Sequence, residues 1–600
     1  MQWYWLIVYA AITIPFAPFV RDPRRFFRGG LNDDSKGIGS LLLLAASASI
    51  SWVFAKSIYN ASTLGAQYGI VGGIAYAGWY TSFPNVAVVI YLLRTRRGVR
   101  SLPLAINERY GSLATLSFGL AVLFRLFQEV WSNALVVGGF YGPAHSREWW
   151  LGAVLSTAIP VVYAFTGGMR ASIMTDSTQI VITIGFLIVV MIVIGIHTPV
   201  DLATFNPAGT CALAGAAASS AASYSGCAAA GGAEVASHVV QDASRALFSF
   251  TNATCSYPTI PTQQMWSLEG GVDLLIVGVL QGCGGYPFFD PVLTDRAFLA
   301  EPRTMLWAFM LGGVVAGAFI ILFGLLGVFG AGQAIMQPSS VPASLFTGML
   351  DGMPSSVSRF FGVGLFSVTN LIFIFESLST LDSTFTSAAK LFGPEFTGLL
   401  EDGMPKPPQR ATITHLAWGR LVIVVLAAVG LLPLLMDVKA LDATTVSGLV
   451  VMGLAPPIVL LLFTSGYRPL TFHLPFWWGV GMGAVYQLAS APCCKATIEM
   501  AGFAIGNGKN NKLLGFNVIG VVVAWILALV TLLENPLGSL LTQGPTEGNS
   551  FWRAGFRQRT QAGDPTPTSV RRVEEFPEEN GKAVPYGSKA VLQVEPATQV

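Results

Sequence analysis

The stretch "FESLSTLDSTFTSAAKLF" (residues 375–392) places ionisable and hydroxyl-bearing side chains inside a long apolar segment. Such groups are costly in hydrocarbon, so each one inside a spanning segment is a candidate functional residue. The polar residues recur at intervals of three or four, which places them on one face of a helix. This polar face comprises Glu376, Ser379, Thr380, Ser383, Ser387 and Lys390, with Asp382 beside it.

Two interpretations of the individual hydroxyls on this face stay open. Hydroxyl and carbonyl oxygens suit a small hard cation such as Na⁺, because such ions prefer oxygen ligands. Ser and Thr can instead bond the carbonyl four residues earlier and only assist helix packing. The packing interpretation is the commoner one for a single hydroxyl. The density of the face and its two carboxylates favour a cation site.

The composition predicts an integral membrane protein. The chain is 53% hydrophobic and 11% charged, whereas soluble domains carry about 25% charged residues. Apolar windows of about 20 residues, the length that crosses a bilayer, recur along most of the chain. We therefore expect an all-α polytopic protein in the lipid bilayer, with about thirteen transmembrane helices. The expected spans are residues 2–20, 38–64, 69–93, 113–141, 149–167, 172–198, 268–288, 304–331, 358–392, 414–436, 441–465, 475–493 and 512–533.

Basic residues concentrate after the odd-numbered spans, as in "RDPRRFFRGG" (21–30), "RTRRGVRS" (94–101) and "DRAFLAEPR" (295–303). Loops rich in Lys and Arg face the cytoplasm, so these exits are predicted to be cytoplasmic. The N-terminus is then outside and the C-terminus cytoplasmic, with the plasma membrane as the expected location.

Two spans are interrupted. "AASASISWVFAKSIYNASTLGAQYG" (45–69) brings small and polar residues into span two, and "GCGGYPFFDP" (282–291) brings Gly and Pro into span seven. Gly holds a helix weakly and Pro removes a backbone donor, so both spans are predicted to be discontinuous helices. Interruptions five spans apart indicate an inverted repeat of five plus five helices, with one helix before it and two after it.

This architecture divides the chain into six parts. Two of them have the low-complexity composition of poorly ordered segments, Ala/Ser/Gly-rich in one case and rich in Pro, Glu, Arg and Gln in the other. The parts are a first transmembrane helix with a cytoplasmic loop (1–37), the first repeat (38–198), an extracellular low-complexity loop (199–266), the second repeat (267–466), accessory transmembrane helices (467–544) and a disordered cytoplasmic tail (545–600).

Two further segments place charges within apolar spans. In "LFRLFQEVWSN" (123–133), Arg125 and Glu129 are four residues apart on one helix and can pair. A structural ion pair is as well supported there as contact with a solute. In "GGMRASIMTDSTQ" (167–179), Asp176 enters the sixth span a short way from the predicted cytoplasmic face.

These motifs resemble those of the sodium:solute symporter family, which includes the proline, pantothenate, glucose and urea symporters. "STLDSTFTSAAKLF" (379–392) resembles the family's sodium-site helix, and "GGMRASIMTDSTQ" resembles its fifth-helix motif. "LPLAINERYG" (102–111) and "YPFFDPVLTDRAFLAEPRT" (286–304) resemble two further family segments. The resemblance covers roughly residues 1–535. It implies a LeuT-like inverted repeat and transport by alternating access.

The resemblance also implies an ion site made by hydroxyls and a carbonyl of span nine, carbonyls of span two and the fifth-helix carboxylate. Two frames for span two stay open, one selecting Ser47 and Ile50 and the other, anchored on "QYG", selecting Trp52 and Ala55. Asp382 lies where the family commonly has a hydroxyl, and we expect it to adjust the charge of the site. The expected cation-binding set is Ser379, Thr380, Glu376, Ser47, Ile50, Asp176 and Asp382.

The solute is expected to contact spans two, three, four and seven. Lys56 lies near the ion site, where a lysine ammonium can substitute for a bound cation. Gly78 precedes Trp79 where sugar-transporting members have a Glu, which argues against a sugar. The expected solute-binding set is Phe54, Lys56, Asn60, Trp79, Gln128, Glu129, Trp131, Tyr286 and Phe289.

The sequence therefore predicts a secondary active transporter that uses a cation gradient to import a small polar organic solute. We expect no enzymatic activity, because the HExxH and GxSxG motifs do not occur. No cofactor is expected, and no metal beyond a transported Na⁺, with H⁺ as the alternative coupling ion. A net charge of +2 gives no indication of a nucleic-acid partner. The alternatives are an H⁺-coupled urea- or amino-acid-type transporter of the same fold, and a non-transporting membrane sensor.

The topology makes a prediction about the loop 199–266. The loop contains an Asn-x-Thr sequon at Asn252, which accepts N-linked glycan only on the lumenal or outer side of a membrane. In a eukaryotic host we expect Asn252 to be glycosylated and the loop to be cleaved by protease added outside intact cells. Mass spectrometry or protease protection that placed this loop inside would overturn the whole predicted topology.

Overall fold

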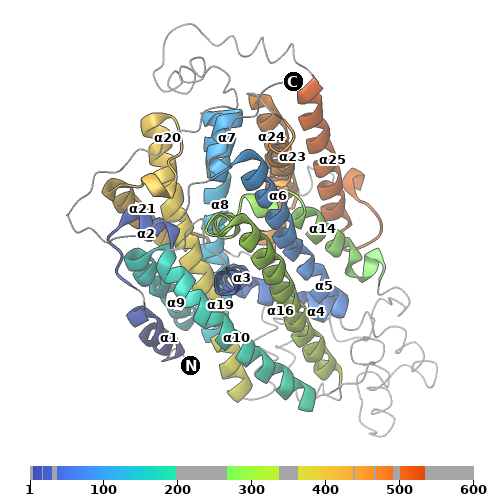
Figure 1. The fold of residues 1–600 in the computed structure, drawn as a ribbon. Helices are drawn as coiled ribbons and strands as arrows, with labels where there is room; N and C mark the ends of the chain where they lie inside the picture. The colour runs from blue at the N-terminus through green and yellow to red at the C-terminus, as the bar shows by residue number, and fades with distance from the viewer. Residues whose placement is uncertain are drawn as a thin grey trace, which may run out of the picture.

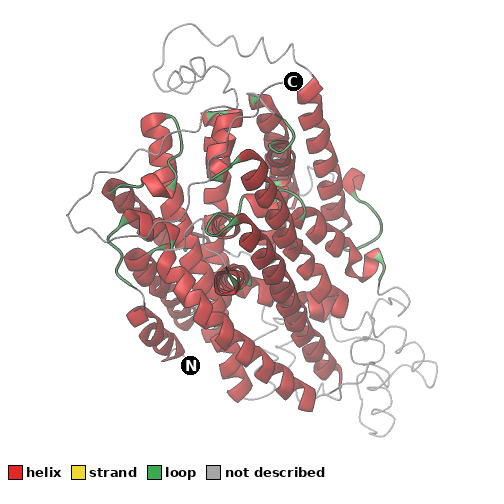
Figure 2. Ribbon diagram, in the orientation of Figure 1, coloured by secondary structure: helices red, strands yellow, loops and turns green. Residues whose placement is uncertain are grey.

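The computed structural model describes residues 4–16, 18–29, 37–197, 266–336, 363–436, 440–464, 468–490 and 501–533. Within these ranges the protein is all-helical and contains no strand (Figure 2). The predicted loop 199–266, apart from its last residue, and the predicted tail 545–600 lie outside the described residues, as does Asn252. What was expected of them stays a prediction.

The helices follow the order in which the apolar windows occur (Figure 1). The first half contains α1 (Tyr4–Thr13), η1 (Ile14–Phe16), α2 (Pro23–Arg28), α3 (Ile38–Trp52), α4 (Ala55–Tyr68), α5 (Ile70–Ala77), η2 (Gly78–Thr81), α6 (Ser82–Arg97), α7 (Leu102–Tyr110), α8 (Ser112–Tyr141), α9 (Arg147–Gly167) and α10 (Met169–His197). The second half contains η4 (Leu268–Val272), α14 (Asp273–Gly282), η5 (Tyr286–Phe288), α15 (Pro291–Arg296), α16 (Pro302–Met336), α19 (Val363–Lys390), η6 (Leu391–Phe396), α20 (Thr397–Asp402), η7 (Pro408–Arg410), α21 (Ile413–Gly430), η8 (Leu432–Leu435), α22 (Ala440–Val450), η9 (Met452–Leu454), α23 (Ala455–Leu460), α24 (Pro469–Ser490), η10 (Ala501–Phe503) and α25 (Asn511–Leu533).

The described residues contain 7 helices that are long and apolar enough to cross a membrane, and up to 8 if the bent pair α3 and α4 forms one span. Each predicted span coincides with helical structure, but several of these helices are short or interrupted. The protein is thus a multi-pass membrane protein. The count of thirteen spans and the inverted repeat stay predictions.

The predicted discontinuity in span two is confirmed. α3 ends at Trp52 and α4 begins at Ala55, with a bend of 63° between them. Backbone groups freed by such a break need partners, because lipid offers none. The Trp52 carbonyl accepts a hydrogen bond from the Tyr80 hydroxyl at 2.9 Å, and the Lys56 N–H donates to Asn133 Oδ1 at 3.4 Å. Neighbouring side chains therefore stabilise the break.

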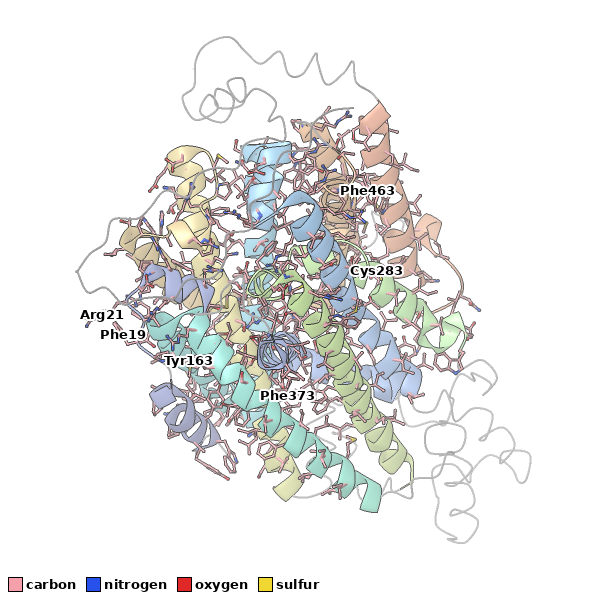
Figure 3. All side chains as sticks on the ribbon, viewed as in Figure 1. Phe19, Arg21, Tyr163, Cys283, Phe373 and Phe463 are labelled. Carbon is pink, nitrogen blue, oxygen red and sulfur yellow. The ribbon has the colours of Figure 1, made fainter. Side chains whose placement is uncertain are left out.

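The predicted break in span seven is confirmed as well. α14 ends at Gly282, and α15 begins at Pro291 after a short 3₁₀ turn, η5. A Cβ on Gly282 would lie only 2.9 Å from the Trp79 carbonyl oxygen, so glycine allows η2 to approach closely. Cys283, labelled in Figure 3, is exposed at the start of the break. Asp290 then caps α15 by accepting a hydrogen bond from Val292 N at 3.0 Å.

The two broken helices meet α10 and α19 in the middle of the molecule. α19 packs against α3, α8, α9 and α10, and α15 packs against α3 and α19. α16 lies along α3, α4, α5 and α6 on another side of α3 (Figure 1). The start of α1 and the end of α25 lie towards opposite ends of the bundle in Figure 1.

The crossing of α16 with α4 and α5 makes a prediction about stability. A Cβ on Gly324 would lie 2.6 Å from the Gly73 Cα, where there is no room for it. We expect Gly324→Ala to cost about 1–3 kcal/mol through overpacking, despite the better helix propensity of alanine. Thermal unfolding of the purified protein in detergent measures this. The matched control on the same helix is Gly317→Ala, whose Cβ would meet only Tyr80 Cβ at 4.0 Å. Equal melting temperatures for the two variants would contradict this account of the crossing.

Candidate functional site

Asp176 on α10 is the centre of the predicted cation site. Its Oδ1 accepts a hydrogen bond from the Ser379 hydroxyl of α19 at 2.6 Å. Its Oδ2 accepts from the Ser47 hydroxyl at 2.6 Å and from the Ser51 hydroxyl at 3.0 Å, both on α3. Three of the residues predicted to bind the cation, Ser47, Asp176 and Ser379, are therefore in direct contact.

The positive charge beside Asp176 comes from the protein itself. The Arg296 side chain, at the end of α15, is fully buried, and its Nη2 donates to Asp176 Oδ2 at 2.9 Å. The same guanidinium donates to the hydroxyls of Ser47, Ser51, Ser172 and Ser383, at 2.8, 2.8, 3.3 and 2.7 Å. A guanidinium thus lies among the oxygens that the sequence assigned to a dissolved cation.

This position of Arg296 corrects one interpretation of the sequence. The segment 295–303 was counted as a basic cytoplasmic exit, yet the structure buries Arg296 completely and leaves Arg303 exposed. The short helix α15 follows the break at 283–290 and carries Arg296 at its end, where the side chain contacts α3 and α10. The support that this segment lends to the predicted topology therefore comes from Arg303 alone.

Asp382 is held by hydroxyl groups. It accepts hydrogen bonds from Ser172 at 2.5 Å, from Tyr163 at 2.9 Å and from Thr175 at 3.1 Å. Figure 3 labels Tyr163, which reaches α19 from α9 and is fully buried. Within the described part of the chain, Asp382 forms no ion pair, and Arg296 pairs with Asp176 alone.

The other predicted cation ligands are buried nearby. Glu376, Thr380 and Ile50 are all 0% exposed. Among the described residues, the Thr380 hydroxyl and both carboxylate oxygens of Glu376 have no hydrogen bond of normal geometry. The alternative frame for span two selects Trp52 and Ala55. The Trp52 carbonyl accepts a hydrogen bond from Tyr80, and Ala55 is the first residue of α4. These facts locate the residues, and their part in binding an ion stays a prediction.

A second buried cluster links the broken helices to α8. Lys56 Nζ lies 2.5 Å from Glu129 Oε1, and Glu129 also pairs with Arg125 one turn earlier. Arg125 continues to Asp290 at 2.9 Å, and the Trp52 indole N–H donates to the same Asp290 oxygen at 2.9 Å. The predicted pairing of Arg125 with Glu129 is confirmed, and the network extends further than the sequence indicated.

Aromatic rings surround the cations of this cluster. The Arg125 guanidinium lies 5.1 Å from the centre of the Phe54 ring, 5.4 Å from that of Tyr286 and 5.8 Å from that of Phe289. Lys56 Nζ lies 5.0 Å from the Phe54 centre. Such distances allow cation–π attraction. The structure therefore brings together five of the residues expected to bind the solute, which are Phe54, Lys56, Glu129, Tyr286 and Phe289.

The remaining four lie apart from this cluster. Asn60 donates to the Tyr76 hydroxyl at 3.4 Å, and the Trp79 ring lies 5.2 Å from the Tyr76 ring. Trp131 packs in a separate apolar group with Ala134, Trp149, Ala153 and Leu434. Gln128 is buried, and its amide oxygen has no hydrogen-bond partner among the described residues.

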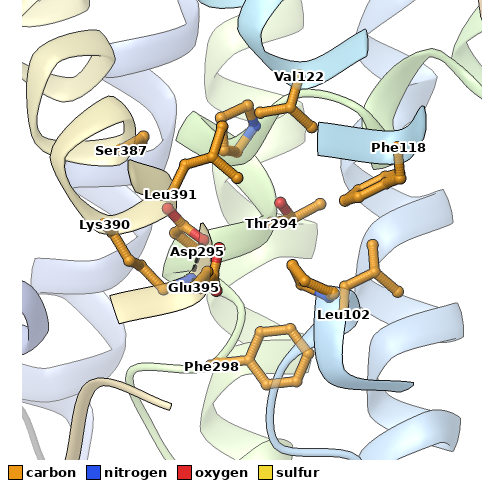
Figure 4. A pocket seen from close by; sticks show the side chains of 12 residues that line it. Leu102, Phe118, Val122, Thr294, Asp295, Phe298, Ser387, Lys390, Leu391 and Glu395 are labelled. Atoms are coloured by element: carbon orange, nitrogen blue, oxygen red, sulfur yellow. Dashed lines mark hydrogen bonds and ion pairs between the residues drawn. The ribbon is translucent and has the colours of Figure 1, made fainter. Parts of the chain in front are cut away.

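A small cavity lies between α7, α8, α15 and α19 (Figure 4). Lys390 enters it from α19 and pairs with Asp295 of α15 and, at 3.0 Å, with Glu395 of η6. The cavity has a volume of about 20 Å³, which is enough for a water molecule and too small for an organic solute. Lys390, which belongs to the polar face of the opening stretch, is therefore paired with two carboxylates at this cavity.

Arg296 and Asp290 are the main residues that sequence reasoning missed as site residues. Both follow the break in span seven, and the sequence assigned neither of them to a site. Their signal was a pair of opposite charges on a short segment directly after a Gly/Pro interruption. Nothing local to the segment showed that the two side chains point into different clusters.

Comparison with known proteins supports the resemblance. No family model matches the chain. Mouse (Mus musculus) sodium/glucose cotransporter 4 is 28% identical over 133 residues, which is 20% of this chain and 19% of that protein. A structure of a Na⁺-coupled sialic acid symporter, in a substrate-bound outward-open state, matches with a TM-score of 0.59 at 14% identity, covering 89% of this chain and 98% of that one.

The chain has the fold of a sodium-coupled symporter. A second structure, of Mhp1, a nucleobase-cation-symport-1 family transporter with bromovinylhydantoin bound, matches with a TM-score of only 0.45 at 14% identity, covering 87% of this chain and 97% of that one. A score this low does not define the fold. The symporter fold accounts for the all-helical architecture of the described residues. The matched sequence spans about a fifth of the cotransporter, so activity and substrate do not follow from it.

The buried charge network makes a prediction about stability. In Asp290→Asn the amide oxygen can keep the cap of α15, but the amide NH2 then faces the donors of Trp52 and Arg125, and Arg125 loses its counter-charge. Breaking a buried ion pair costs about 3–5 kcal/mol. Thermal unfolding in detergent should show this loss. The control is Glu401→Gln in the exposed pair with Lys406, where the expected loss is about 0–1 kcal/mol. A mild effect at Asp290, similar to that at Glu401, would show that the network contributes little to stability.

Proposed function

We propose that this protein is a secondary active transporter, which couples the entry of a small polar organic solute to a cation gradient by alternating access. The observation that carries the proposal is an excess of carboxylates between α10 and α19. Asp176, Asp382 and Glu376 are all fully buried there, and the single guanidinium of Arg296 accompanies them. An uncompensated buried charge is costly, so this contact region between α10 and α19, termed the seam, favours binding of a positive charge from solution.

Coupling through such a site has a clear source of free energy. One positive charge that moves across the membrane gains about 2.3 kcal/mol per 100 mV of membrane potential. The ion's own concentration gradient adds to this. A cation that neutralises the seam in one conformation and leaves it in another would transfer this free energy to the solute.

The cluster around Arg125 supports a polar solute. Lys56 and Arg125 offer donors, Glu129 and Asp290 offer acceptors, and Phe54 provides an apolar face. These groups now satisfy one another, so a solute that carries both donors and acceptors can exchange places with parts of the network. A sugar is disfavoured as the solute, because Gly78 precedes Trp79 where the sugar-transporting members of the resembled family have a Glu.

Proton coupling is the second candidate, and Arg296 favours it. A metal ion at Asp176 must displace a guanidinium that already makes five hydrogen bonds to side chains there. A proton can add to Asp382 if one of the hydroxyls that donate to it turns and accepts instead, and no charged group has to leave. The choice between Na⁺ and H⁺ is therefore part of the test.

The test is uptake by the purified full chain in proteoliposomes. The panel comprises radiolabelled urea, proline, pantothenate, nucleobases, short acids and polyamines, each under an inward Na⁺ or H⁺ gradient. We expect at least one solute to accumulate under one of the two gradients. Its accumulation should cease when an ionophore dissipates that gradient. Failure of the whole panel under both gradients, with folded protein, would contradict transport and favour the sensor.

Thr380 gives a residue-level prediction. Valine has the same shape as threonine, and the Thr380 hydroxyl has no partner among the described residues, so Thr380→Val should leave stability unchanged. Loss of one hydroxyl ligand to an ion costs about 1.5–3 kcal/mol, so the cation concentration for half-maximal uptake should rise about 10- to 150-fold. Thr369→Val is the control, because it removes another buried hydroxyl without a partner from α19. Identical cation dependence in the two variants would remove Thr380 from the site.

A further inference from the structure

The seam between α10 and α19 continues beyond Asp176. Ser172 contacts Asp382 and Asp176 contacts Ser379, so residue numbers rise along α10 as they fall along α19. The helices are therefore antiparallel, and the next residues to face each other are Gln179 and Thr183 on α10 and Glu376 on α19. Thr183 lies close enough to the Glu376 carboxylate to interact with it, although the two form no hydrogen bond of normal geometry.

Unpartnered oxygens gather at this level of the seam. Glu376, Thr380 and Thr183 are 0% exposed, and Gln179 is 1% exposed. Among the described residues, the side-chain oxygens of all four lack a hydrogen bond of normal geometry. Buried polar atoms in folded proteins nearly always have a partner, so these five oxygens without a partner on one seam require an explanation. The Gln179 amide nitrogen, in contrast, donates to Tyr9.

The ionisable groups around Glu376 do not neutralise it. Its charged neighbour is Asp176, which carries the same sign, and the Tyr80 hydroxyl of η2 donates to the Trp52 carbonyl. Arg296 is committed to Asp176, and Tyr163 of α9 is committed to Asp382. Other ionisable side chains lie on the remaining helices packed against α19. Tyr9 on α1 is bound to Gln179. Lys56 on α4 and Arg125 and Glu129 on α8 are paired among themselves and with Asp290.

We infer that the monovalent cation attracted to the seam binds at Glu376, with Thr183, Gln179 and the adjoining Thr380 as further ligands, and not at the centre that Arg296 occupies. A carboxylate, two hydroxyls and an amide oxygen are hard ligands, suited to Na⁺. A proton on the carboxylate neutralises the same charge. Either ion relieves the repulsion between Glu376 and Asp176. The role of the site in coupling rests on the proposed function, but its ability to bind a cation does not.

The test is thermal unfolding of the purified full chain in detergent, with wild type compared with Glu376→Gln. In the first arm, Na⁺ replaces choline at constant ionic strength and fixed pH. In the second arm, the pH is varied from about 5 to 8 in choline alone, because a carboxyl protonated in the native state and ionised in the unfolded chain makes stability fall as pH rises. Glu401→Gln is the control, since it removes a partly exposed carboxylate outside the site.

We expect wild type and Glu401→Gln to respond alike in at least one arm. If the ion is Na⁺, the Na⁺ concentration needed for equal stabilisation of Glu376→Gln should rise about tenfold or more. If the ion is H⁺, the pH dependence of the unfolding free energy of Glu376→Gln should decrease by the equivalent of about one bound proton. The first result assigns the site to Na⁺ and the second to H⁺. No response of wild type in either arm, or equal responses in Glu376→Gln, would overturn the inference.

A second variant guards against misfolding of Glu376→Gln. Thr183→Val keeps the carboxylate and removes only the hydroxyl that approaches it, so we expect several-fold weaker cation stabilisation with an unchanged melting temperature in choline. An unchanged cation response would again overturn the site. Because unfolding requires no solute, a Glu376-dependent response without uptake would leave the site standing while the transport proposal fails. Gradient-driven uptake with no such response would reject the site alone.

Discussion

The buried contact between Arg296 and Asp176 joins parts of the chain that are far apart in sequence. Through it, the end of α15 holds the two serines of α3, the carboxylate of α10 and Ser383 of α19 in one place. A guanidinium in an apolar interior is tolerated only when its donors are satisfied and its charge is paired. That requirement fixes how the first broken helix, the second broken helix and the α10–α19 pair meet.

The break in span seven makes this contact possible and connects it to the second cluster. α15 is short, and it carries Asp290 at its start and Arg296 at its end. Asp290 holds Arg125 and Trp52, whereas Arg296 holds Asp176. Any movement of α15 therefore changes both clusters together. This arrangement supplies a shared element that two sites can both bias, which is the physical requirement for coupling between an ion and a solute.

Charge is distributed unequally between the two clusters. The Arg125 cluster contains two cations and two anions and is internally balanced. The α10–α19 seam contains three carboxylates and one guanidinium. A balanced network can rearrange around a neutral or zwitterionic molecule at little electrostatic cost. An unbalanced one attracts a cation, so the two clusters suit the two components of a symport reaction.

Local pattern in the sequence determined the helical class, the polar face of α19, both helix breaks and the Arg125–Glu129 pair. Each of these depends on residues within a few positions of one another, through periodicity, Gly/Pro backbone effects or i, i+4 spacing. Only the tertiary structure decided which charges meet. Arg296 is 120 residues from Asp176, and Lys56 is 73 from Glu129, and no local rule selects such partners. Helix packing brings them together, because burial leaves each charge no alternative to the opposite charge that the fold places beside it.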